Sequence, residues 1–191
     1  MKPTVLKFMC ILYFTPAIGC DPDSVPEDAE RPALTLKEVN DAQQGWCDGL
    51  ISIAKANAAG GDYKSLATAM LSNLYDFDEG QVLFRPTLSF GEQTFRFSKD
   101  DAAAYFIGGN PKFPGDDGFA LKPWVGCRYT NAGDGAGVLI NGDFAATMGN
   151  VFLTDAKGDE LMVDKLFVFR RGDDGKLRIT VHKSALPNPV P

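Results

Sequence analysis

Residues 143–170 read DFAATMGNVFLTDAKGDELMVDKLFVFR, and this stretch decides the fold class. Apolar and β-branched side chains recur through 143–154 and again through 160–170, with Asp, Lys and Gly gathered between them. This pattern predicts two long strands joined by a tight turn. The Asp-Asp-Gly turn signal at 173–175 then predicts a third strand over 177–183, paired with the second.

Amphipathic helices are expected before these strands. Thr35 and Glu38 form a capping box, in which a hydroxyl and a carboxylate bind the free N–H groups at a helix start. Apolar residues then recur at helical spacing up to an Ala-Gly-Gly break, after which Asp62 can cap a second helix. Ser98 can cap a third, short helix that a Gly-Gly-Asn sequence ends.

Helices followed by a run of strands predict the α+β class, with about three N-terminal helices wrapping a curved antiparallel sheet. Shorter strands are expected at 81–85, 124–130 and 137–140. A bent sheet wrapped by helices encloses a cone that can hold a small molecule among apolar side chains. This order of elements indicates the NTF2-like architecture, which hosts several enzymes and non-catalytic modules, so the fold alone leaves the function open.

Residues 1–20, MKPTVLKFMCILYFTPAIGC, have the composition of an export signal. The apolar run at 8–14 is too short to span a bilayer. The last four residues, Ala-Ile-Gly-Cys, resemble a lipobox, which predicts lipidation of Cys20 and a membrane anchor; plain secretion is the alternative. Residues 21–34 are acidic and Pro-rich, as in a solvated tether, so the NTF2-like domain is expected over 35–191 and its location in the periplasm or cell envelope.

Charge and metal-ligand content exclude several classes of function. Lys and Arg total 19 against 25 Asp and Glu, so the chain lacks the basic footprint of a nucleic-acid-binding protein. It has one histidine, His182, and no Cys-x-x-Cys or His-x-His spacing, so we predict no metal site of the usual zinc type. After export Cys47 and Cys127 would remain, either as one disulfide or as two buried thiols.

His182 has two interpretations. Its ordinary pKa of about 6.5 suits a proton acceptor or relay, while a buried, hydrogen-bonded core histidine is equally compatible with the sequence. Ser184 lies two residues further along and would share a face of an extended strand with His182.

Several short stretches in order resemble the iota-class carbonic anhydrases, exported or organellar NTF2-like proteins related to the association domain of calmodulin-dependent kinase. The resemblance covers about residues 36–187, essentially the whole domain after the tether. The stretches are 82–87 (VLFRPT), 94–96 (TFR), 105–110 (YFIGGN), 117–124 (DGFALKPW), 148–150 (MGN) and 182–187 (HKSALP).

The resemblance implies the reversible hydration of carbon dioxide to bicarbonate, without a protein-bound metal, although zinc or manganese is described for some relatives. Thr87, Tyr105 and Ser184 match the family's hydroxyls that surround the substrate. His182 matches the first histidine of its C-terminal motif, and we expect it to accept or relay the proton that water loses. The resemblance also implies a homodimer formed through the sheet.

Carbon dioxide is small and apolar, so an aromatic-lined cone can admit it. Phe84, Phe106 and Trp124 are candidate lining residues, as are Phe119 and Phe167. Taken singly, each of these side chains fits a plain core position better than a pocket wall.

The chain departs from the family pattern at two places. Residues 165–169, KLFVF, replace the usual Tyr-Thr-Phe-Gly-Tyr, and Lys183 and Ala185 replace a histidine and a serine. If His182 and Ser184 point into the cone, we expect Lys165 and Lys183 to point outward.

These departures keep two alternatives open. One is a non-catalytic NTF2-like module for ligand binding or association. The other is an isomerase or dehydratase that uses His182 together with a carboxylate such as Asp164.

Overall fold

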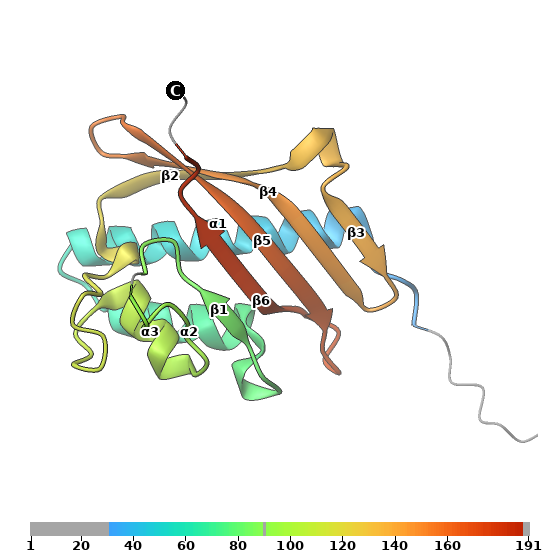
Figure 1. Ribbon diagram of the computed structural model, residues 1–191, viewed down its shortest axis with the longest axis horizontal. Coiled ribbons are helices and arrows are strands. Elements are labelled where there is room, and N and C mark those ends of the chain that lie inside the picture. Colours follow the sequence, from blue (N-terminus) through green and yellow to red (C-terminus); the bar gives the residue numbers. More distant parts are fainter. Residues whose placement is uncertain (1–30, 90, 189–191) are drawn as a thin grey trace, which may run out of the picture. The chain divides into compact units, whose positions relative to one another are not determined.

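The computed structural model describes residues 31–89 and 91–188, where helices precede a curved sheet (Figure 1). The predicted α+β class is confirmed. The elements in chain order are α1 (Leu36–Ala58), α2 (Tyr63–Leu74), η1 (Asp76–Asp78), β1 (Leu83–Arg85), α3 (Lys99–Ile107), η2 (Phe119–Leu121), β2 (Trp124–Asn131), η3 (Ala132–Gly135), β3 (Val138–Asn141), β4 (Phe144–Asp155), β5 (Glu160–Arg171) and β6 (Leu177–Ala185).

The export signal, with Cys20, and most of the tether lie outside the described residues. Within the described part of the chain, no helix combines the length and apolarity needed to cross a membrane.

The three α-helices begin at the predicted caps. Thr35 Oγ1 accepts from the Glu38 N–H, and the Glu38 carboxylate accepts from the Thr35 N–H at 2.8 Å, which completes the capping box. Asp62 and Ser98 cap α2 and α3 by accepting from the N–H groups of Ser65 and Asp101, without the reciprocal bond of the capping box. Gly108 ends α3 at a φ of 67°, a left-handed conformation that glycine adopts without strain.

The sheet has the strand order β1-β6-β5-β4-β2, and β3 also pairs with β4. The predicted hairpins 143–170 and 160–183 are present as antiparallel pairs. The pairing of β1 with β6 is parallel, which the expectation of an antiparallel sheet did not include. A three-residue strand carries no sequence signal for its direction, because helices and loops on either side decide how it enters the sheet.

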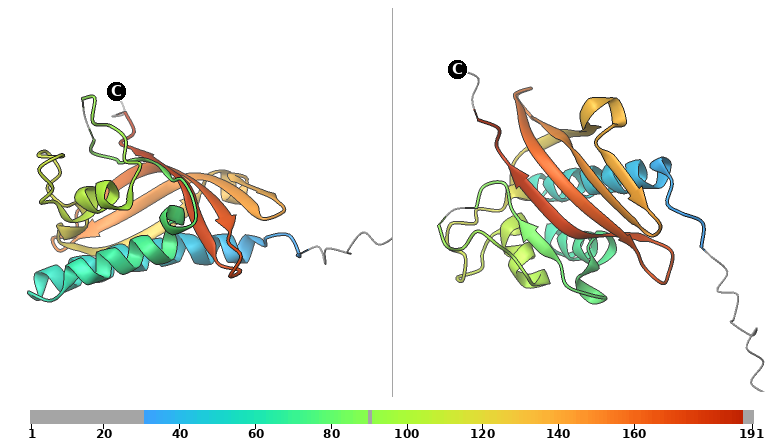
Figure 2. Two further views of the ribbon diagram at one scale, coloured as in Figure 1. Left: turned by 90° about the horizontal axis from the view of Figure 1, so that it is seen from below. Right: turned by 45° about the vertical axis from the view of Figure 1, so that its right-hand side comes forward.

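Helix α1 lies along the inner face of the sheet, and Figure 2 shows it running beneath the strands. A disulfide between Cys47 on α1 and Cys127 on β2 links these layers, which resolves the alternative that the sequence left open. The two cysteines are 80 residues apart, so closing this loop restricts the unfolded chain and contributes about 4 kcal/mol of stability in the chain-entropy account.

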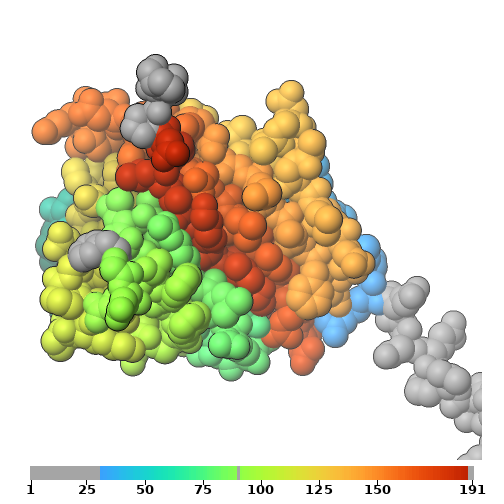
Figure 3. Space-filling view, in the orientation of Figure 1, coloured from blue at the N-terminus to red at the C-terminus, as the bar shows by residue number. Residues whose placement is uncertain are grey.

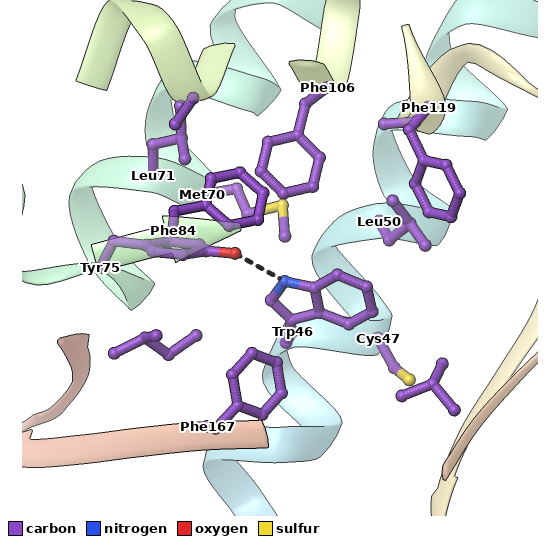
Figure 4. Packing of buried hydrophobic residues seen from close by; sticks show 14 of the residues in the cluster. Trp46, Cys47, Leu50, Met70, Leu71, Tyr75, Phe84, Phe106, Phe119 and Phe167 are labelled. Carbon is purple, nitrogen blue, oxygen red and sulfur yellow. Dashed lines mark hydrogen bonds between the residues drawn. The ribbon is translucent and has the colours of Figure 1, made fainter. Parts of the chain in front are cut away.

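Aromatic rings fill the space between α1, α2 and the sheet. Trp46 on α1 is fully buried, and its Nε1–H donates to the Tyr75 hydroxyl at 2.9 Å, as Figure 4 shows. Phe84, Phe106 and Phe167 surround this pair. A hydrogen bond in an apolar surrounding is costly to break, so it fixes the position of both rings.

Candidate active site

Two of the predicted hydroxyls meet where β1 ends beside β6. Thr87 Oγ1 donates to Ser184 Oγ at 2.7 Å, and Ser184 Oγ donates to the Asp164 carbonyl at 3.1 Å. The parallel register places Arg85 opposite Lys183, so the chain after β1 continues past Ser184. Both hydroxyl side chains are buried.

Arg85 holds this junction together. Its Nη1 donates to the carbonyl oxygen of Ser184 and to that of Pro86 at 3.0 Å, so the guanidinium bridges the two segments that carry the hydroxyls. The side chain is half-buried and places a positive charge close to the hydroxyl pair. Arg85 belongs to the 82–87 stretch, but no feature of that stretch pointed to a role for its side chain.

Tyr105 on α3 brings a third hydroxyl to the cluster. The side chain is 5% exposed, and its hydroxyl has no hydrogen-bond partner among the described residues. Burial raises the pKa of Tyr105 well above its ordinary value, and the neighbouring polar groups of Thr87 and Leu88 offset only part of this effect. The Tyr105 hydroxyl is therefore protonated at neutral pH and lies close to polar groups of Thr87 and Leu88 without a well-formed hydrogen bond to them, so it can donate to a bound ligand.

A hollow of about 180 Å³ reaches the Tyr105 side chain. An ion pair between the buried side chains of Arg96 and Asp116, 2.7 Å long, fixes the loop that forms part of its wall. The lining residues are Leu88, Tyr105, Gly115, Asp116, Asp117, Gly118, Phe119 and Lys122.

His182 shares the inner face of β6 with Ser184, as predicted. Its hydrogen bonds are to Tyr75 and Lys165 and not to the hydroxyl pair. Nδ1 lies 2.8 Å from the Tyr75 hydroxyl, and Nε2 lies 3.0 Å from Lys165 Nζ. Burial, and then the neighbouring Lys165, lower the pKa of His182 well below its ordinary value. The ring is therefore neutral at physiological pH. The sequence did not reveal Tyr75 as a partner, because it follows α2 with no motif around it.

The expectation that Lys165 points outward is wrong. The side chain is 3% exposed and lies on the inner face, because Lys165 is the register partner of Ser184 in an antiparallel pair. Residues directly opposite each other in such a pair point to the same side of the sheet. Burial lowers the pKa of Lys165 well below its ordinary value.

Lys183 points outward, as expected, and its Nζ lies 2.7 Å from an Asp164 carboxylate oxygen. The Asp164 carboxylate therefore lies on the face opposite His182. This arrangement rules out the pairing of His182 with Asp164 that the isomerase or dehydratase alternative requires.

The predicted lining residues divide into two groups. The Phe84 ring lies between those of His182 and Tyr105, at centroid distances of 4.5 and 5.7 Å, and Phe106 lies 5.5 Å from Tyr105. Trp124 lies further from Tyr105, because the Phe119 ring packs between them. The indole N–H of Trp124 donates to the Phe119 carbonyl. Phe84 and Phe106 thus border the hydroxyl cluster, and Trp124 does not.

Within residues 31–89 and 91–188, no group of three His, Cys, Asp or Glu side chains is arranged to hold a metal ion. The polar groups that converge on this region are hydroxyls, an amine, an imidazole and a guanidinium. These groups can donate hydrogen bonds to an anion and can exchange a proton.

In a comparison with known proteins, the chain matches the model of one family and a curated relative from it. The sequence model described as metal-independent carbonic anhydrase matches residues 37–186. A metal-independent carbonic anhydrase of Nostoc sp. is 41% identical over 157 residues, which cover 81% of this chain and 75% of that protein.

Solved structures agree with the sequence match. The cyanobacterial iota-carbonic anhydrase complexed with bicarbonate has a TM-score of 0.78 and 41% identity, with 83% of this chain and 95% of that chain covered. A putative calcium/calmodulin-dependent protein kinase II association domain of Xanthomonas campestris has a TM-score of 0.52 at 19% identity, over 84% and 98% of the chains. An NTF2-like protein of Salmonella enterica has a TM-score of 0.50 at 9% identity, over 81% and 92%. The last two show the fold alone, and the NTF2-like architecture is confirmed.

The buried amine of Lys165 gives a testable pH dependence of stability. Unfolding exposes Lys165 to water, where its ordinary pKa is about 10.4, so the unfolded chain binds a proton that the folded chain does not. Stability then rises with pH between the lowered pKa and the ordinary one. We expect the free energy of unfolding of the wild type to rise relative to Lys165→Met by up to about 1.4 kcal/mol per pH unit.

Urea unfolding at several pH values from 7 to 9.5 measures this difference in slope. Lys183→Met, which removes the neighbouring exposed lysine, is the control for the loss of one amine. Parallel curves for the wild type and Lys165→Met would mean that the buried amine carries a proton in the folded state.

Proposed function

The chain belongs to the metal-independent carbonic anhydrase family, and we propose that it hydrates carbon dioxide reversibly to bicarbonate at the cluster of Thr87, Tyr105 and Ser184. One observation carries the assignment of the site. The buried Tyr105 hydroxyl has no hydrogen-bond partner among the described residues, and it lies beside the bonded pair Thr87–Ser184. A bound substrate oxygen would supply the missing acceptor.

The three hydroxyls can stabilise the charge that develops as water adds to carbon dioxide. Tyr105 donates to one oxygen of the forming bicarbonate. The hydroxyl hydrogens of Thr87 and Ser184 rotate about their C–O bonds, so either can turn from its resting acceptor towards a second oxygen. Fixed donors of this kind contribute roughly 10²–10³ in rate each. The Arg85 guanidinium beside them favours an anionic product.

The surroundings suit a small substrate. Phe84 and Phe106 present apolar rings beside the hydroxyls, and the hollow at Tyr105 measures about 180 Å³. The hydroxyl of Tyr105 is not the base that activates water, because burial raises its pKa. A nitrogen base must take that proton, and we propose that His182 takes part through its contact with Lys165.

Removing single hydroxyls tests the site. We expect Tyr105→Phe and Ser184→Ala each to lower kcat by about 10²-fold, because each loses a donor to the developing anion. The measurement is stopped-flow carbon dioxide hydration by chelator-treated protein, with and without added zinc or manganese.

Tyr63→Phe on α2, whose side chain is partly buried, and Ser52→Ala on the exposed side of α1 are the matched controls, because neither hydroxyl belongs to the cluster. If a folded Tyr105→Phe kept wild-type activity, the hydroxyl cluster would not be the site. An inactive wild type under every condition would favour the non-catalytic association module.

We propose that the outer face of the sheet forms a homodimer interface. Leu139 and Met148 on this face are 64% and 61% exposed, and no helix of the described residues covers β4 and β5 there, as Figures 1 and 3 show. A hollow of about 580 Å³ beside Met148 and Leu166 adds to this apolar surface. Apolar patches of this kind mark protein contacts.

Sedimentation equilibrium at micromolar concentration tests the interface. We expect a dimer for the wild type and a monomer for Met148→Glu, because a buried, unpaired carboxylate opposes association. Lys157→Glu in the β4–β5 turn should remain dimeric, and a monomeric wild type would contradict the proposal.

We propose that the protein is held in the cell envelope by a lipid on Cys20. The Ala-Ile-Gly-Cys sequence supports lipidation, and the Cys47–Cys127 disulfide fits an oxidising compartment. Fatty-acid labelling in a bacterial host tests this. The wild type should incorporate label and sediment with membranes, and Cys20→Ser should do neither; equal labelling of both would contradict the anchor.

A further inference from the structure

We propose that Lys165 Nζ, held by His182, is the base that takes the proton from water as it adds to carbon dioxide. The inference rests on the proposed function, since it supplies the step that the hydroxyl cluster leaves open. An O–H bond of water breaks, and its proton binds the Nζ lone pair to form an ammonium. A C–O bond forms between the water oxygen and carbon dioxide, and one C=O π pair moves onto oxygen to give bicarbonate.

The strand register places the backbone of Lys165 beside Ser184, one member of the hydroxyl cluster. Lys165 on β5 is opposite Ser184 on β6, and both side chains are buried on the inner face. The Cβ atoms of directly opposed residues lie about 4.5–5.5 Å apart. The stem of Lys165 therefore starts beside Ser184, and its amine ends at His182 Nε2, 3.0 Å away.

The surroundings of the amine favour a base that cycles between neutral and charged forms. Its nitrogen lies 3.8 Å from the centroid of Trp46 and 5.4 Å from that of Phe167, so an ammonium formed there faces aromatic rings. Among the described residues no carboxylate is bonded to Nζ, since the Asp164 carboxylate points to the other face and binds Lys183. The amine is therefore not committed to a permanent ion pair.

The hydrogen-bond chain behind Lys165 can serve both forms of the amine. The Tyr75 oxygen accepts a hydrogen bond from Trp46 Nε1–H. It can accept a second one from His182 when Nδ1 carries the ring proton. Nε2 is then an acceptor for an N–H of Lys165 in either form; in the neutral amine the Nζ lone pair remains available, and in the ammonium it holds the proton taken from water. Protonation strengthens this bond, because the donor then carries a charge.

The other titratable groups near the amine do not compete for the proton at neutral pH. Tyr75 contacts the far nitrogen of His182, and burial raises the pKa of Tyr75 well above its ordinary value. The Tyr129 hydroxyl donates to the Lys165 carbonyl at 3.3 Å, and burial raises its pKa to about 12. The lowered pKa of Lys165 keeps the amine unprotonated and able to accept.

Lys165→Met tests the proposal in the chelator-treated full chain, with Lys183→Met as the matched control on the outer face. We expect Lys165→Met to lower kcat for hydration by about 10²-fold with little change in KM, as for loss of a general base. The wild-type rate should fall as pH decreases through the apparent pKa of Lys165. The residual rate of Lys165→Met should lack this pH dependence. If Lys165 had only a structural role, the variant would be slower but would keep the pH dependence of the wild type.

A second measurement holds even if Lys165→Met folds poorly. In the wild type labelled with ¹³C at lysine Cε, one NMR signal should titrate well below the ordinary range of lysine. Wild-type rates and an unchanged pH profile in Lys165→Met, or the absence of such a signal, would overturn this inference alone. An inactive wild type would overturn the proposed function as well.

Discussion

The parallel pairing of β1 with β6 is the contact on which the site depends. Only this register carries Thr87 past Ser184, and the Arg85 guanidinium fixes it by bonding carbonyl groups on both segments. The antiparallel partner of β6, β5, then brings Lys165 to the same place from the other side. The site is therefore assembled by backbone pairing between three strands and completed by Tyr105 from α3.

This arrangement buries polar groups that a stable core would avoid. An amine, an imidazole and an unpaired phenol each cost free energy when water is removed from them. Two features of the fold oppose that cost. The aromatic cluster around Trp46 buries a large apolar area, and the disulfide from Cys47 to Cys127 restricts the unfolded chain. Polar groups kept in the interior at such a cost are where function is expected.

The sequence predicted what depends on local pattern and missed what depends on register. The caps at Thr35, Asp62 and Ser98 and the long hairpin follow from residue types at fixed spacing. The inward direction of Lys165 does not, because alternation along β5 alone leaves both faces possible until Ser184 is known to be its partner. Tyr75 likewise has no local motif, and its role arises only when packing brings it to His182.

One physical cause gives the proposed site both an acid and a base. Burial disfavours charge on every group, so it raises the pKa of Tyr105 and lowers those of His182 and Lys165. The phenol thus remains a hydrogen-bond donor while the nitrogens remain acceptors at the same pH. Such a site matches a reaction whose reactants, water and carbon dioxide, are both neutral. In the proposed reaction the forming anion meets the hydroxyl donors beside the Arg85 guanidinium, and the proton meets the neutral nitrogens of Lys165 and His182.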